Sequence, residues 1–195
     1  MMNIQVVILC GGKGTRLEGM DLPKPLCSIR GKSLIYHVLE GLPKEIDNVT
    51  FFYTEHLDKV QFERTIIHSC YGLQKFQFQK ISIETRGPVE TAYVGLHKGI
   101  FDINKPILFI DNDTVNLFSL SSINKDYLGI GTFQTQNTSK PYSFLQINSD
   151  KKVINIKEKQ GISNIYSTGL YYFPTVKAFK DLCDNLFDIF PNKTE

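Results

Sequence analysis

A glycine-rich turn with two basic side chains lies near the start of the chain and could hold phosphate groups. It runs Gly11-Gly12-Lys13-Gly14-Thr15-Arg16 and directly follows an apolar run. Glycines let the backbone approach closely, so that successive N–H groups can converge on a phosphate. The Arg16 guanidinium adds a fork that fits two phosphate oxygens. Two other phosphate motifs are excluded, because Leu17 replaces the last glycine of G-x-G-x-x-G and Leu26 replaces the first glycine of a Walker A loop.

A pair of carboxylates could provide the matching cation site. Asp111 and Asp113 follow the apolar run 106–110, and hard carboxylate oxygens are ligands that suit Mg²⁺ bridging nucleotide phosphates. The alternative is a polar turn in which these side chains cap the backbone.

Strands and helices must alternate to position these groups. Strands are predicted at 4–10, 48–53, 76–83 (with a bulge) and 106–110, and helices at 34–42, 56–69 and 88–100. Further strands are predicted at 127–136, 142–148, 152–157 and 165–173, before a final helix at 176–190. Alternating elements predict a doubly wound α/β sheet, whose ligands bind beyond the carboxyl ends of the strands. The glycine turn and the acidic pair should therefore share one rim.

Three segments together resemble the sugar-phosphate nucleotidyltransferase family. They are Gly11 to Leu17, Leu22-Pro23-Lys24-Pro25-Leu26 and Gly31-Lys32-Ser33-Leu34-Ile35. The resemblance implies a nucleotide-diphospho-sugar transferase-like (GT-A-like) fold, with a mostly parallel mixed sheet flanked by helices. It implies catalytic roles for Arg16, facing the departing pyrophosphate, and Lys24, against the α-phosphate. The nucleotide-binding residues that it implies are Leu9, Gly11, Gly12, Gly14, Thr15, Arg16 and Gly87.

The resemblance extends into the distal half of the chain. The family carries Gly-Asp-Asn or Asn-Gly-Asp-Thr at the metal site, so that either Asp113, which we favour, or Asp111 is the ligand. Gly87 belongs to a segment that resembles a Gly-Thr-Ala element near the nucleobase, interrupted here by Pro88 and Val89. Acceptor-binding roles are implied for Glu158, Lys159, Thr168 and Gly169.

The implied reaction joins a nucleoside monophosphate from an NTP to a sugar 1-phosphate or similar acceptor and releases pyrophosphate, with Mg²⁺ as cofactor. The attacking phosphate oxygen is already an anion, so charge neutralisation matters more than a base. Three alternatives remain open: transfer to a phosphocholine-like amino-alcohol, a GT-A glycosyltransferase, and a non-catalytic subunit that binds nucleotide sugars.

Length and composition set the remaining expectations. A chain of 195 residues predicts a single domain, with a nucleotide-binding half at 1–125 and an acceptor-binding half at 126–195. The formal net charge of +2 argues against a nucleic-acid binder. Four cysteines without a CxxC pair predict buried, reduced thiols. The N-terminal apolar run is too short for a signal peptide or a membrane span, which predicts a cytoplasmic protein.

The C-terminal end departs from the family pattern. Family members usually continue with a further helix, a strand and a second metal-binding aspartate, whereas only residues 175–195 remain here, enough for one helix. The expectation is a truncated C-terminal part, with the apolar face of the last helix covered by a second copy of the chain, by a missing domain or by docking on the sheet.

Overall fold

The computed structural model describes residues 3–12, 22–98, 100–136 and 143–189. Gly14, Thr15 and Arg16 lie outside these ranges, so their predicted roles are not tested by the structure.

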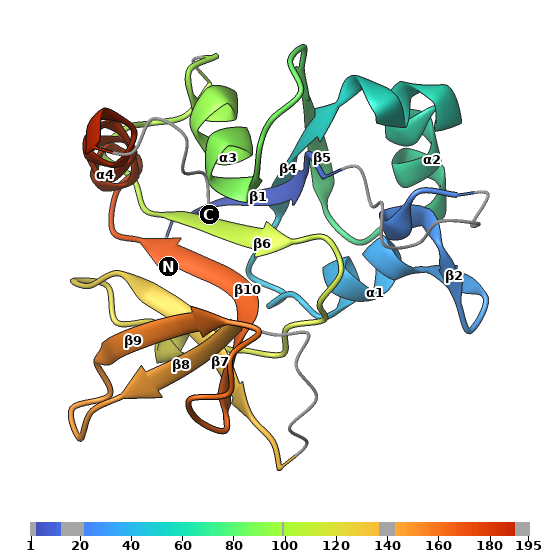
Figure 1. Ribbon diagram of the computed structural model, residues 1–195. Helices are drawn as coiled ribbons and strands as arrows, with labels where there is room; N and C mark the ends of the chain where they lie inside the picture. Colours follow the sequence, from blue (N-terminus) through green and yellow to red (C-terminus); the bar gives the residue numbers. More distant parts are fainter. Residues whose placement is uncertain (1–2, 13–21, 99, 137–142, 190–195) are drawn as a thin grey trace.

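One mixed sheet forms the centre of the molecule, with strand order β5-β4-β1-β6-β10-β8-β9 and with β7 paired to β10 (Figure 1). The first four strands in this order are parallel, and β10, β7, β8 and β9 extend the sheet with antiparallel pairs. The bounds are β1 Gln5–Cys10, β4 Asn48–Thr54, β5 Lys75–Ile81, β6 Ile107–Asp111, β7 Gly129–Gln134, β8 Ser143–Ile147, β9 Val153–Glu158 and β10 Ile165–Phe173. The expected fold class is confirmed.

Helices cover both faces of the parallel part. Alternate residues of β1 enter different cores, which is why its sequence is apolar throughout. On one face, Ile8 packs with α1 (Leu34–Glu40) and α2 (Phe62–Ser69). On the other, Val7 packs with α3 (Pro88–Leu96) and α4 (Val176–Ile189).

The short elements near the rim agree with their sequence signals. Ser33 caps α1 by accepting a hydrogen bond from the Tyr36 N–H. The preceding residues form a hairpin of β2 (Ser28–Ile29) and β3 (Lys32–Ser33), in which Arg30 and Gly31 have positive φ. Short 3-10 helices lie at Lys24–Leu26 (η2) and Leu120–Ser122 (η4).

Three predicted boundaries are wrong. The helix expected over 56–69 is divided into a 3-10 helix, η3 (Glu55–Val60), and α2, because Gln61 adopts a left-handed conformation between them. The strand β5 ends at Ile81 and pairs with β4 in continuous register, without the expected bulge. The helix α3 ends at Leu96, four residues early.

The last helix docks on the sheet. Phe179 is buried against Phe109 of β6 and Phe173 of β10, and Cys183 is also buried in this core. Leu182 remains 47% exposed. Among the expected ways of covering this face, docking on the sheet therefore accounts for the residues that enter the core.

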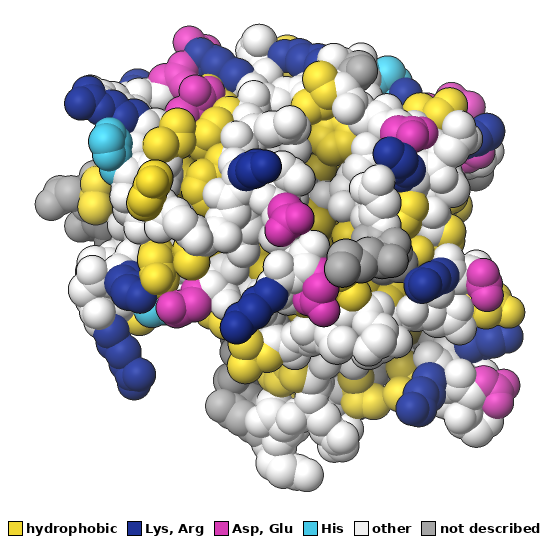
Figure 2. All heavy atoms as spheres, turned by 180° about the vertical axis from the view of Figure 1, so that it is seen from behind, with side chains coloured by type: hydrophobic (Ala, Val, Ile, Leu, Met, Phe, Trp, Pro, Cys, Tyr) yellow, Lys and Arg dark blue, Asp and Glu magenta, His cyan; other side chains and the backbone are white. Residues whose placement is uncertain are grey.

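Charged side chains of both signs are mixed on the surface (Figure 2), and the thiols are buried. On the face shown in Figure 2, basic and acidic side chains are interspersed rather than gathered into a basic stripe. All four cysteines are buried, and none of them forms a disulfide bond. Among the described helices, none combines the length and the apolar character needed to cross a lipid bilayer.

Candidate active site

The carboxyl ends of β1 and β6 bring Gly11 and Gly12, the start of the glycine turn, beside the acidic pair. These parallel strands are neighbours, and the last residues that they pair are Leu9 and Asp111. Gly11 and Gly12 directly follow the end of β1, and Asp113 lies just beyond the end of β6. The Leu9 side chain is buried in the core, so that a role in nucleotide binding would fall to its backbone. The structure thus joins two motifs about 100 residues apart.

Lys24 lies at the same rim. Its ammonium group forms a salt bridge with one carboxylate oxygen of Asp113, and the other oxygen accepts a hydrogen bond from the Thr114 hydroxyl at 3.2 Å. The side chains of Lys24 and Asp113 are 38% and 29% exposed, so that both are open to a ligand. A predicted catalytic cation and a predicted metal ligand are therefore in direct contact.

Asp111 is the more deeply placed of the two carboxylates. The pKa of Asp111 is raised to about 7, mainly by burial and also by the negative charge of Asp113, while the positive charge of Lys24 opposes the shift. The site therefore holds negative charge that a cation would stabilise.

The donor chemistry of this pair fits Mg²⁺. Within the described part of the chain there is no group of three or more His, Cys, Asp or Glu side chains suited to a metal. Mg²⁺ is commonly held by one or two carboxylates together with substrate phosphates and water. Asp113, with Asp111 behind it, would provide the protein's share of that set.

Gly11 must be glycine because another segment packs against it. A Cβ atom at Gly11 would lie 2.4 Å from the Thr91 hydroxyl oxygen. The same hydroxyl donates to the Gly87 carbonyl at 3.0 Å and pairs with the Thr85 hydroxyl at 2.6 Å. The segment that contains Gly87, the predicted nucleobase neighbour, is therefore held against Gly11, the first residue of the glycine turn. The role of Thr91 was missed, although Thr91-Ala92 matches the end of the Gly-Thr-Ala element.

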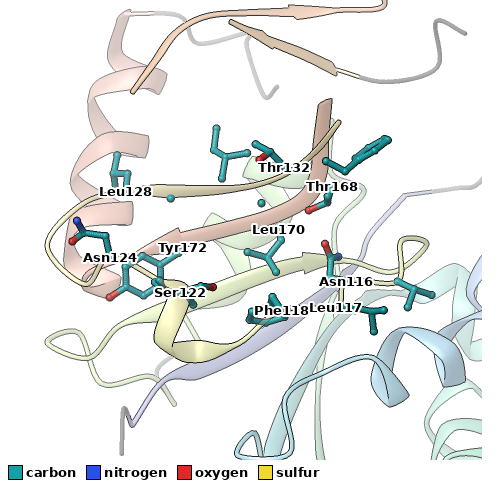
Figure 3. A pocket seen from close by; sticks show the side chains of 16 residues that line it. Asn116, Leu117, Phe118, Ser122, Asn124, Leu128, Thr132, Thr168, Leu170 and Tyr172 are labelled. Carbon is teal, nitrogen blue, oxygen red and sulfur yellow. The ribbon is translucent and has the colours of Figure 1, made fainter. Parts of the chain in front are cut away.

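The two predicted acceptor residues on β10 face opposite sides. Gly169 has a φ of +72° and packs on the Asp111 carboxylate. The Thr168 side chain instead lines a cavity of about 510 Å³ with Leu170 and Tyr172 (Figure 3). Pairing between β10 and β7 shifts register between Ser167 and Tyr171. The structure therefore brings Gly169, but not the Thr168 side chain, to the acidic pair.

Glu158 and Lys159 lie farther along the sheet. They form a salt bridge of 2.6 Å, with both side chains about half exposed. Glu158 ends β9, and two strands, β10 and β8, lie between β9 and β6 in the sheet. Their predicted contact with an acceptor is not tested by these distances.

We expect Gly169→Ala to disturb the acidic pair. A Cβ atom there would lie 2.1 Å from an Asp111 carboxylate oxygen, and the left-handed backbone conformation alone costs roughly 1–2 kcal/mol for a non-glycine residue. The melting temperature and the turnover rate should both fall. Gly161→Ala is the control, because a Cβ atom there would be in ordinary contact with a Phe144 ring carbon at 3.8 Å. Equal behaviour of the two variants would contradict the close contact.

The pKa of Asp111 predicts how stability depends on pH without metal. This carboxyl group has a pKa of about 7 when folded and an ordinary value of 3.8, so the folded protein retains a proton that the unfolded chain releases. Its contribution to stability is complete below pH 4 and is lost as the pH rises toward and through 7. Thermal unfolding in EDTA between pH 5 and 8 should therefore show Asp111→Asn gaining stability relative to the wild type. A constant difference would contradict the raised pKa.

A parallel sheet that brings the start of a glycine turn, a lysine and two carboxylates to its carboxyl rim is typical of α/β proteins that bind ligands at that rim. The nucleotidyl transferase family model matches residues 5–186 of this chain, and the chain belongs to that family.

Sequence relatives include bifunctional proteins GlmU. The protein from Methanococcus vannielii is 25% identical over 181 residues, which cover 86% of this chain and 40% of the relative. A probable glucose-1-phosphate cytidylyltransferase of Bacillus subtilis is 49% identical over 39 residues, 19% of this chain and 15% of the relative. The chain thus spans about 40% of the length of the GlmU relatives.

Solved structures share the fold. HddC from Yersinia pseudotuberculosis superposes with a TM-score of 0.74 at 26% identity, over 91% of this chain and 79% of that one. A nucleoside-diphosphate-sugar pyrophosphorylase from Vibrio cholerae RC9 gives a TM-score of 0.77 at 23% identity, over 98% and 83% of the two chains. The second similarity supports the fold alone.

Proposed function

We propose that this protein transfers a nucleoside monophosphate from an NTP to a sugar 1-phosphate, or to a similar small phosphorylated acceptor, and releases pyrophosphate. The observation that carries the proposal is the contact between Lys24 and Asp113 beside Asp111, next to the glycine turn. Membership of the nucleotidyl transferase family supports it. So does the solution of the HddC structure in complex with GMP-PN, because HddC shares the fold at 25% identity.

The reaction is an in-line displacement at phosphorus. A phosphate oxygen of the acceptor forms a bond to the α-phosphorus, the bond from that phosphorus to the bridging oxygen breaks, and its electron pair leaves with pyrophosphate. No strong base is needed, because the attacking oxygen is already an anion. The main barrier is the repulsion between phosphate groups, which fixed cations reduce.

Different parts of the chain would bind the phosphates, the metal and the two substrates. Lys24 would neutralise the α-phosphate. Gly12 is exposed, and among the described residues no atom would lie within 4 Å of a Cβ atom placed there, so its backbone could meet a phosphate. Bound Mg²⁺ would neutralise further phosphate charge at Asp113 and Asp111. Residues 1–125 would bind the nucleotide and residues 126–195 the acceptor, with Gly169 at the boundary between them.

Pyrophosphate release from a matrix of substrates tests the proposal. ATP, CTP, GTP and UTP are each combined with a panel of sugar 1-phosphates and with phosphocholine-like amino-alcohols. Release that requires both an NTP and a sugar phosphate supports the proposal. Release only with an amino-alcohol phosphate would replace the acceptor class, and nucleotide binding without pyrophosphate in any combination would contradict transferase activity.

A further inference from the structure

The side chain of Asn112 connects the two halves of the candidate site. Asn112 stands between Asp111 and Asp113, and its amide nitrogen donates a hydrogen bond of 2.6 Å to the Leu9 carbonyl, 103 residues away in sequence. Leu9 lies two residues before the glycine turn begins. A single side chain therefore ties the segment that carries both carboxylates to the strand end that carries the turn.

This cross-link lies where the backbone pairing ends. The last paired residues of β1 and β6 are Leu9 and Asp111, so Asn112 supplies a connection at the rim beyond the ladder. Asn112 also interacts with the buried Cys10 thiol and lowers the pKa of that thiol, against the larger effect of burial, which raises it. The amide thus lies beside two consecutive residues of β1.

Other elements hold the same strand end on its remaining sides. The Gly11 carbonyl accepts a hydrogen bond from the Thr54 hydroxyl at 3.4 Å, on β4, and Gly11 packs against Thr91 of α3. These contacts position the turn relative to β4 and α3. Asn112 positions it relative to the acidic pair.

We infer that Asn112 is a positioning residue that couples nucleotide binding to metal binding, by fixing the distance between the glycine turn and the carboxylates. The inference rests on the proposed function, in which the turn holds nucleotide phosphates and the carboxylates hold the metal. Metal and phosphates stabilise each other only when both are held at the correct separation, and such mutual stabilisation is a coupling between the affinities for two ligands.

The experiment measures that coupling in the absence of acceptor. The dissociation constants of ATP, CTP, GTP and UTP are determined by calorimetry in EDTA and in Mg²⁺, for the wild type and for Asn112→Ala. The wild type should bind its nucleotide more tightly in Mg²⁺, by roughly 5- to 150-fold. In Asn112→Ala most of this gain should be lost while the affinity in EDTA is retained. Turnover should fall by about 10²-fold, the cost of a small misplacement of reacting groups.

Asn116→Ala is the matched control. Asn116 is a buried asparagine of the same segment, and its amide donates to the Thr114 carbonyl at 3.2 Å without reaching β1. This variant should lose a comparable amount of thermal stability and keep the coupling. Asn112→Ser, whose hydroxyl is too short to reach Leu9, repeats the test if Asn112→Ala does not fold.

The remaining outcomes distinguish a failure of the Asn112 inference from a failure of the proposed function. Full coupling and turnover in both Asn112 variants would overturn the inference, as would a loss of nucleotide affinity in EDTA, which would indicate a purely structural role. A wild type that binds none of the four nucleotides would contradict the proposed function instead, before any variant is compared.

Discussion

Lys24→Ala should lower turnover by about 10²–10³-fold, the usual cost of removing a group that stabilises developing charge. Lys24 is partly exposed and meets Asp113 at the rim, so its loss removes charge from the site and little packing from the core. The melting temperature should change little. The measurement is the steady-state rate at saturating NTP and acceptor, taken together with a thermal unfolding curve.

The same substitution should have the opposite effect on metal binding alone. In the wild type the ammonium group of Lys24 already neutralises Asp113, and a divalent ion must compete with it. Without Lys24, Mn²⁺ added in the absence of nucleotide should bind more tightly, as measured by the loss of its free electron paramagnetic resonance signal. If the substitution instead unfolded part of the protein, turnover and Mn²⁺ binding would both decrease.

Lys177→Ala is the control for losing a lysine from an ion pair. Lys177 pairs with Asp181 at 2.6 Å within α4, and both side chains are exposed. This variant should retain turnover and metal affinity. A Lys24→Ala enzyme that matches it in both measurements would remove Lys24 from the catalytic assignment.

Local signals in the sequence predicted most of the elements. The apolar run of β1, the cap at Ser33 and the proline that opens α3 each act on neighbouring residues, so they can be read without knowing the fold. The helix break at Gln61 was missed because the apolar spacing continues across it. A left-handed residue changes the path of the chain without changing that spacing.

The sequence predicted that the candidate site lies at one rim of the sheet, but it did not predict which side chains contact one another there. The rule for parallel sheets places Gly11 near Asp111, since both follow neighbouring strands. The hydrogen bond from Asn112 to Leu9 depends on side-chain direction across 103 residues, which no local pattern contains. The opposite directions of Thr168 and Gly169 depend on how β10 lies between two parts of the sheet. The roles of Glu158 and Lys159 stay predictions.

Asp113→Asn should raise the Mg²⁺ concentration required for half-maximal turnover more than Asp111→Asn does. Asp113 is partly exposed and already meets a cation, Lys24. Asp111 is more buried and, with a pKa of about 7, is partly protonated near neutral pH. Changes to groups that support a metal ligand typically reduce metal affinity about 10- to 100-fold. We therefore expect Asp111→Asn to raise the required Mg²⁺ concentration by a factor within that range, and Asp113→Asn to raise it by a larger factor.

Mg²⁺ titrations of turnover for the two variants decide the assignment. Thermal unfolding in EDTA provides the control for folding, and there Asp111→Asn should be at least as stable as the wild type near pH 8, because the substitution removes a buried negative charge beside Asp113. The reverse order of Mg²⁺ requirements would transfer the ligand role to Asp111. Full turnover of the wild type in excess EDTA would end the metal assignment for both carboxylates, and it would leave Lys24 as the cation that faces the phosphates.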